Sequence, residues 1–171
     1  MKNHQQIVSE WLKQIGNTKN LLLQLDEDGH CVVSAENGMH GVIEVPAVMD
    51  VPAVFIYLPL ISLSDNPATQ SALTRAALEM NLFGLLTGGC QIALDNRSNY
   101  VVLSYSVMID AIDGALFQRV LIDMLEAAPR LQQRLQNIVT PTTLSTDQLI
   151  LSQHCFTKRT SVLKSPLKLT N

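Results

Sequence analysis

The side chains with the clearest chemical potential in this sequence are three cysteines and four histidines. Two cysteines directly follow a histidine, as His30-Cys31 and His154-Cys155. A thiol nucleophile needs a base held beside it in space, and adjacency in sequence does not provide one. Cys31 and Cys90 lie in apolar segments of strand length, where cysteine behaves as a small hydrophobic residue. We therefore expect structural cysteines and no catalytic residues, with a hydrolase or thiol enzyme using Cys31 or Cys90 as the last of three alternatives.

Acidic and glycine-rich segments offer little further chemistry. Asp26-Glu27-Asp28 has the composition of a turn, and Asp110 with Asp113 precedes a helical pattern. Neither has the alternating ligands of a calcium loop. Gly88-Gly89 follows a helical segment and precedes a strand, the reverse of the order in phosphate-binding loops. We expect no metal site and no cofactor.

Composition points to a protein that binds another protein. Apolar residues make up 47% of the 171 residues and charged residues 16%, so some apolar surface is available for a partner. Residues 1–137 carry 8 Lys/Arg against 14 Asp/Glu, whereas residues 138–171 carry 4 Lys/Arg against one Asp. An acidic body is unsuited to nucleic acid, which requires clustered cations.

The sequence predicts a cytoplasmic location. The N-terminal stretch MKNHQQIVSEW has no apolar core of a signal peptide. The most apolar run, residues 51–63, contains two prolines and is too short to span a bilayer, so we expect no membrane insertion. The three cysteines are not spaced like metal ligands, and their odd number suits a reducing compartment.

The N-terminal half predicts one helix and several strands. Residues 3–15 have apolar side chains at helical spacing, and Gly16 is expected to end that helix. Residues 21–26 and 31–36 are expected to form a hairpin around Asp28-Gly29. Asn37-Gly38 offers another turn, and residues 41–45 a short strand or bulge. Residues 54–62 form a third long strand, in which Pro59 must lie at an edge or a bulge.

The second half predicts helix, hairpin, helix. Asn66 and Pro67 are typical of a helix start, and the helix that follows is apolar on most of its circumference, with Gly88-Gly89 as its stop. Two strands then flank a polar turn at residues 95–99. Asp113 can cap a last helix that Pro129 should kink or end.

The predicted fold is therefore α+β, in the order α-β-β-β-α-β-β-α, with a mostly antiparallel twisted sheet of about five strands. Residues 1–137 form one domain, and residues 138–171 read as a partly disordered extension. Strands that are apolar on both faces need two covers, and the helices supply one. The other face is the candidate partner surface, and a loop or the C-terminal extension is the alternative cover. The candidate partner-binding residues are Leu22, Val32, Phe55, Tyr57, Ile7 and Trp11.

The stretch LTRAALEMNLFGLLTGGCQIALDNRSNYVVLSYSVMIDAID, from Leu73 to Asp113, resembles the middle of the class I type III secretion chaperones, the Tir-chaperone-like (CesT-like) family. The likeness in element order covers roughly residues 3 to 137. The family's motifs are hydrophobic patterns, and it has no catalytic set to transfer. The extension after Asn137 and Pro129 in the last helix depart from the family pattern.

The resemblance implies a bacterial cytoplasmic homodimer that binds the N-terminal region of a type III secreted effector in extended form. Such a chaperone uses no ATP itself, keeps the effector soluble and secretion-competent, and delivers it to the export apparatus, whose ATPase is a further candidate partner. The implied dimer contact comprises Leu73, Ala77, Met80, Leu82, Tyr100, Leu103 and Tyr105. The alternative of another class is an α+β adaptor that scaffolds a cytosolic complex without an export role.

Overall fold

The computed structural model describes residues 3–19, 21–47 and 52–140. The chain divides into one unit of residues 1–139 and another of residues 140–171, and all elements of the described part lie in the first unit. The predicted extension, with His154 and Cys155, lies outside the described residues except at its first positions. No helix in the described part is long and apolar enough to cross a membrane.

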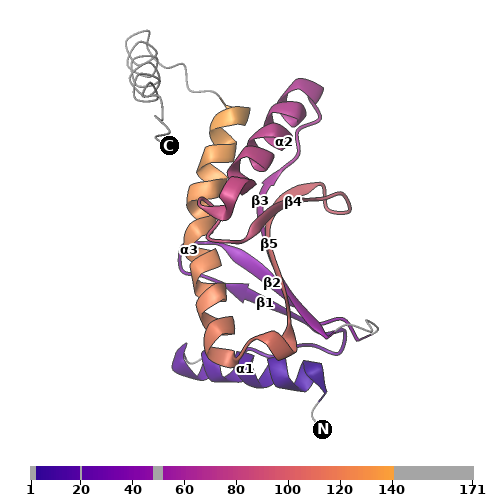
Figure 1. The fold of residues 1–171 in the computed structure, drawn as a ribbon, viewed down its shortest axis with the longest axis vertical. Helices are drawn as coiled ribbons and strands as arrows, with labels where there is room; N and C mark the ends of the chain where they lie inside the picture. The colour runs from indigo at the N-terminus through magenta and orange to yellow at the C-terminus, as the bar shows by residue number, and fades with distance from the viewer. Residues whose placement is uncertain (1–2, 20, 48–51, 141–171) are drawn as a thin grey trace, which may run out of the picture. The chain divides into compact units, whose positions relative to one another are not determined.

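The elements follow the predicted order, α-β-β-β-α-β-β-α (Figure 1). The helices are α1 (His4–Lys19), α2 (Pro67–Asn81) and α3 (Gly114–Val139). The strands are β1 (His30–Ser34), β2 (His40–Glu44), β3 (Ala53–Ser62), β4 (Gln91–Asp95) and β5 (Tyr100–Met108), with short 3-10 helices η1 (Leu82–Gly84) and η2 (Ile109–Ala111). The five strands form one antiparallel sheet in the order β1-β2-β3-β5-β4. The α+β prediction is confirmed.

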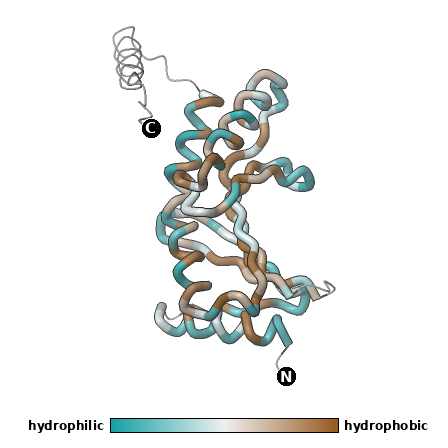
Figure 2. The backbone as a smooth tube through the Cα atoms, in the orientation of Figure 1, coloured by the Kyte–Doolittle hydropathy of each residue, from teal (hydrophilic) through white to brown (hydrophobic). Residues whose placement is uncertain are grey.

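The helices cover one face of this sheet. Helix α3 packs along β3, with α1 against one part of it and α2 against another (Figure 1). Buried residues of all three helices and of the facing strand positions join in a single core cluster. Figure 2 shows hydrophilic and hydrophobic positions alternating along α3, as an amphipathic helix requires.

Strand β3 is the central element of the core. Val54, Ile56, Leu58 and Leu60 alternate along it and are each at most 1% exposed. Pro59 lies on the other face at a register shift in the pairing with β5. The bulge accommodates the missing N–H within a central strand, so the expected bulge at Pro59 is confirmed.

The first hairpin pairs different segments from those predicted, which were residues 21–26 with residues 31–36. Residues 21–26 form no strand, although Asp26 N donates to His30 O at 2.7 Å across the turn. The true hairpin is β1–β2, closed at Asn37-Gly38, where Gly38 has φ +81° and Gly38 N donates to Ala35 O. The Asp28-Gly29 turn exists, but it only leads the chain into β1.

Helix α1 does not end at Gly16, as the sequence suggested, but continues to Lys19. A Cβ atom at Gly16 would overlap the backbone carbonyl of Leu21, and Leu21 N donates to Gly16 O at 2.9 Å. The glycine is therefore needed for close passage of the returning chain. Only glycine provides that room.

Helix α2 begins as predicted and ends earlier than predicted. Asn66 Oδ1 accepts hydrogen bonds from the N–H groups of Ala68 and Thr69, with Pro67 at the first turn. The helix ends at Asn81, not at Gly88-Gly89, and η1 and a turn follow. Local contacts of the Asn81 side chain with β4 fix this early end, as described below.

Helix α3 also begins as predicted, because Asp113 Oδ1 accepts from Leu116 N at 2.8 Å. It does not end at Pro129 and runs on to Val139. Ala128, Leu131 and Leu135 are at most 3% exposed on the core side of this segment. Their burial stabilises the helix against the lost hydrogen bond.

Candidate partner-binding surfaces

The two described cysteines are buried free thiols. Cys31 and Cys90 are 6% and 9% exposed. Burial raises the pKa of both thiols, with a further rise at Cys90 from Asp123. A raised pKa keeps each thiol in its less nucleophilic neutral form. This geometry fits the predicted structural role.

Polar contacts of the two strand histidines are local. His30 lies 3.8 Å from Asp26 and 3.7 Å from Glu44, and all three side chains are partly solvent-exposed. The Nδ1 atom of His40 lies 2.9 Å from Ser34 Oγ across the β1–β2 pair. Within the described ranges, no group of three His, Cys, Asp or Glu side chains could hold a metal ion.

The face of the sheet opposite the helices carries an apolar row. Val32 pairs with Val42, Val42 with Tyr57, and Tyr57 with Ser104, so their side chains project from one face. A second row contains Glu44 and Phe55 next to Tyr57. We call Val32, Val42, Phe55 and Tyr57 the outer sheet face. These side chains share one face because successive side chains of a β-strand point to opposite faces of the sheet.

The outer sheet face is partly open to solvent. Val32 is 64% exposed, and Val42, Phe55 and Tyr57 are half-buried by their neighbours in the sheet. Partial burial and the nearby Glu44 raise the pKa of Tyr57, so its hydroxyl is neutral and can donate a hydrogen bond. An apolar face with one acidic neighbour is suited to bind an extended or helical segment.

A second apolar surface lies where α2 ends. We call it the α2 patch, and it is formed by residues that are 43–83% exposed: Leu78, Leu82, Phe83, Leu85 and Leu86. These residues are close in sequence and span the last turn of α2, η1 and the following turn. Several large exposed apolar side chains in one place indicate a protein–protein contact.

Asn81 fixes the geometry of the α2 patch. Its side-chain amide donates to Ile92 O at 2.9 Å and accepts from Ile92 N at 2.7 Å, and so joins the end of α2 to β4. Phe83 then adopts φ +61° and is 82% exposed. The left-handed conformation is unfavourable for a bulky residue. It holds the phenylalanine ring outside the protomer core.

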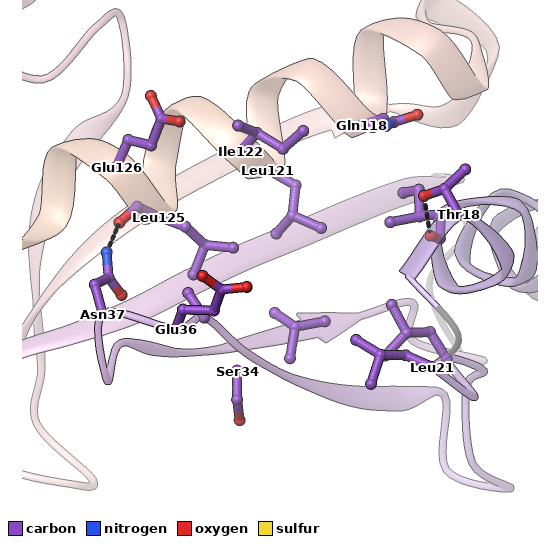
Figure 3. Close-up of a pocket in the computed structure, with 14 residues that line it drawn as sticks. Thr18, Leu21, Ser34, Glu36, Asn37, Gln118, Leu121, Ile122, Leu125 and Glu126 are labelled. Carbon is purple, nitrogen blue, oxygen red and sulfur yellow. Dashed lines mark hydrogen bonds between the residues drawn. The ribbon is translucent and has the colours of Figure 1, made fainter.

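A groove lies between the end of α1, strand β1 and α3 (Figure 3). We call it the α1–β1–α3 groove; its volume is about 420 Å³. Asn37 Nδ2 donates to Leu125 O at 3.0 Å and ties the β1–β2 turn to α3 at one end. The lining is mainly apolar, with Ile15, Leu21, Leu23, Val33, Leu121, Ile122 and Leu125.

The predicted partner-binding residues occupy three different places. Val32, Phe55 and Tyr57 share the outer sheet face. Leu22 is 83% exposed in the irregular segment before β1. Ile7 and Trp11 pack on the core, with the Trp11 ring 5.5 Å from that of Phe117. The structure therefore does not bring α1's two candidates onto the outer sheet face.

The predicted dimer residues divide between core and surface. Leu73, Met80 and Leu103 are at most 6% exposed within the protomer. Ala77 and Tyr105 are half-buried against the same core. Leu82 and Tyr100 are 63% and 39% exposed. Of the seven, Leu82 and Tyr100 have the side chains most available to a second copy, and Ala77 and Tyr105 are partly accessible.

Sequence reasoning did not assign Val42, Leu78, Phe83, Leu85 or Leu86 to a binding surface. For Val42 the signal was the turn at Asn37-Gly38, which makes residues 40–44 a paired strand. For the leucines the signal was a helix that is apolar on most of its circumference, which needs a second cover. The left-handed backbone of Phe83 had no sequence signal.

Several solved structures share this fold. One is a chain of the HopA1–SchA chaperone–effector complex, with a TM-score of 0.56 and 18% identity over 74% of this chain and 94% of that one. Another is a chain of the ExsC–ExsE complex. Its TM-score is 0.59, with 16% identity over 75% of this chain and 92% of that one. A third is a chain of the heterodimeric ExoU–SpcU complex from the type III secretion system of Pseudomonas aeruginosa. Its TM-score is 0.54, with 18% identity over 79% of this chain and 99% of that one. These identities establish likeness of fold.

No curated protein sequence matches the chain. A family model does, and it describes the Tir chaperone protein (CesT) family and matches residues 10–132. The match runs from the middle of α1 through most of α3 and includes both apolar surfaces and the groove. The resemblance noted in the sequence is thereby confirmed: the chain belongs to the Tir chaperone protein (CesT) family.

Proposed function

We propose that this protein is a homodimeric cytoplasmic chaperone that binds the N-terminal region of a type III secreted effector in extended form. It keeps that effector soluble and secretion-competent and presents it to the export apparatus. It acts by binding and has no catalytic role. The observation that carries the proposal is a family fold with two separate exposed apolar surfaces, one on the sheet and one at the end of α2.

The two surfaces suit two different partners. The α2 patch is exposed and continuous in sequence across the end of α2 and η1, so the same residues can meet their own copies across a two-fold axis. The outer sheet face is bordered by polar side chains, with Ser104 and Ser106 on β5 beside Tyr57 and Phe55. That arrangement suits an extended guest whose alternate side chains contact the sheet. We therefore assign the α2 patch to self-association and the outer sheet face to the effector.

Capture from the native host tests the proposal. The tagged protein is expected to retain a stoichiometric secreted protein through roughly its first hundred residues. The double variant Phe55→Asp, Tyr57→Asp is expected to lose that protein while keeping its thermal unfolding transition and its dimer mass, because both side chains project away from the core.

Matched variants separate the effector site from general surface effects. Leu116→Asp introduces the same charge on α3, where Leu116 is 45% exposed and lies outside both surfaces. It should retain the effector. Unchanged retention by the folded Phe55/Tyr57 double variant would refute the assignment of the outer sheet face. Capture of folded cytosolic subunits in place of a secreted protein would favour the adaptor function.

A further inference from the structure

A second cavity lies beside the α2 patch, between the turn that follows η1 and the middle of α3, which are neighbours in the fold (Figure 1). We call it the α3 pocket. Its volume is about 280 Å³, which is below the roughly 300–1,000 Å³ of small-molecule sites and suits one large side chain. Its apolar lining comes from that turn, from β5 and from α3, and includes Leu86, Cys90, Tyr105, Val120, Met124 and Ala127.

The α3 pocket has an apolar floor and a polar rim. Cys90 and Met124 are 9% and 1% exposed, so they lie at its floor. Its charged lining residues, Asp123, Glu126 and Arg130, all belong to α3 and are exposed. An apolar pocket with a polar border is the form that receives a buried anchor side chain at the centre of a protein interface.

The protomer leaves this pocket unfilled although a large ring lies close to it in sequence. Phe83 comes two residues before Leu85, the first turn residue of the lining, but does not itself line the pocket. Its left-handed backbone, with φ +61°, holds the ring 82% exposed. Gly88 also lines the pocket, and a Cβ atom there would have no other atom within 4 Å, so this side of the pocket is open.

The α2 patch is too small to form a stable dimer by itself. The exposed fractions of its five residues together equal between three and four complete side chains, or about 400 Å² at roughly 120 Å² each. A specific interface of standard size buries about 800 Å² on each partner. A two-fold contact through the patch must therefore continue onto neighbouring surface. The α3 pocket adjoins the patch, since Leu85 and Leu86 belong to both.

We propose that Phe83 of each copy of this chain enters the α3 pocket of the other copy. The inference rests on the proposed homodimer and assigns its central contact. Ring and pocket lie on the same surface of the protomer, so a two-fold axis between them makes both insertions at once. Each ring then leaves water and meets the sulfur atoms of Cys90 and Met124, which make favourable contacts with aromatic rings. Phe83 does not meet its own copy in this arrangement.

Two variants remove the contact from opposite sides. Phe83→Gly removes the ring, and Ala127→Phe fills the pocket from α3, where Ala127 is half-buried. Each should raise the dimer Kd about a hundredfold, because two rings return to water. Ala115→Phe adds the same ring at an exposed site of α3 outside the pocket and should leave the Kd unchanged. Sedimentation equilibrium gives the three Kd values, and thermal unfolding at high dilution checks that each variant folds.

Mixing the two weakened variants gives the sharpest test. A Phe83→Gly copy keeps an open pocket, and an Ala127→Phe copy keeps the ring at position 83. Their mixed dimer regains one of the two contacts, whereas each variant alone has none. Half of the lost free energy is then recovered, so the mixed dimer should have a Kd about tenfold below that of either variant alone. Titrating fluorescein-labelled Phe83→Gly chain with unlabelled Ala127→Phe chain measures it by anisotropy.

Photochemical cross-linking locates the ring without altering the pocket. The variant Phe83→p-azidophenylalanine keeps the aromatic ring and forms covalent bonds on illumination with groups that touch it. A covalent dimer should appear on a denaturing gel. Its joined peptides should contain position 83 of one copy and residues 120–130 of the other. A mixture of isotope-labelled and unlabelled chains shows that the two peptides come from different copies.

Three results would overturn the proposal and leave the homodimer standing. The first is a mixed dimer whose affinity lies between those of the two variants, which indicates that Phe83 meets its own copy. The second is an unchanged dimer Kd in folded Ala127→Phe. The third is a cross-link from position 83 to position 83, or none between copies, and this result decides alone if Ala127→Phe does not fold. A wild-type protein that stays monomeric at every concentration would instead contradict the proposed homodimer itself.

Discussion

Replacing Phe83 by glycine should have opposite effects on the dimer and on the protomer. Phe83 is 82% exposed and adopts φ +61°. Full burial of a phenylalanine side chain stabilises by about 2 kcal/mol. With the exposed part buried in both copies of a two-fold dimer, Phe83→Gly should cost about 3 kcal/mol of association, or about a hundredfold in Kd.

The protomer should lose nothing by the same change. A left-handed backbone costs a residue with a side chain about 1–2 kcal/mol, and glycine adopts it freely. Glycine's greater freedom in the unfolded chain offsets about 0.5–1 kcal/mol of that gain. The free energy of unfolding of the monomer should therefore stay equal or rise slightly.

Sedimentation equilibrium over a range of concentrations gives the dimer Kd, and urea unfolding at high dilution gives the stability of the protomer. Leu116→Gly is unsuitable as a control because it would also weaken α3, so Leu116→Ser serves as the control for an exposed apolar side chain outside the α2 patch. A dimer Kd unchanged by Phe83→Gly would refute the assigned interface. A large loss of protomer stability would show that the ring contributes to the core.

Three further outcomes follow from burial and hydrogen bonding. Met80→Ala should lower the protomer's free energy of unfolding by about 2–5 kcal/mol, because Met80 is 6% exposed. Leu78→Ala on the same helix should change the protomer's free energy of unfolding by less than about 0.5 kcal/mol, because Leu78 is 67% exposed within the protomer. Equal effects in urea titrations at high dilution, where the protein is monomeric, would contradict the packing. Asn81→Ala should cost about 1–3 kcal/mol, because two hydrogen bonds to the backbone of β4 are lost, and a neutral result would contradict that role. Burial raises the pKa of the Cys31 and Cys90 thiols, so the unfolded chain loses these protons at a lower pH than the folded chain does. The free energy of unfolding should therefore fall as pH rises above the ordinary thiol pKa of about 8.5. The variant with both cysteines replaced by alanine should show a smaller fall across the same pH range.

Local chemistry made much of the fold predictable. Asn66 and Asp113 cap their helices as their side chains suggest, because a short oxygen-bearing residue before an apolar run satisfies free N–H groups wherever the helix lies. Strand β3 was recognisable because Val54, Ile56, Leu58 and Leu60 alternate with less buried neighbours. Both signals are contained in a few adjacent residues.

The errors arose where distant contacts decide the structure. Residues 21–26 alternate like a strand, yet pairing of β1 with β2 and β2 with β3 provides the sheet, and the earlier segment lines the groove through Leu21 and Leu23. A glycine at position 16 is typical of a helix end. It lies inside α1, however, because the backbone at Leu21 passes too close for a side chain there. Such contacts have no local signal.

The candidate surfaces were partly predictable for the same reason. The period of two in β3 was enough to place Phe55 and Tyr57 on the face away from the core. Helix α2 carries apolar residues on most of its circumference, so periodicity alone could not tell which ones face inward. The structure places Leu73 and Met80 in the core and leaves Leu78 and Leu82 outside.

The central claim is that a dimer of this chain holds the N-terminal region of a secreted effector without folding it. Hydrogen exchange on the purified complex, with its mass measured in parallel, tests this most directly. The proposal predicts two copies of this chain per effector, protection of the outer sheet face in β1–β3, and no cooperative protection within the bound effector segment beyond the residues in contact. A single copy per effector, or a bound effector segment protected throughout like a folded domain, would contradict it.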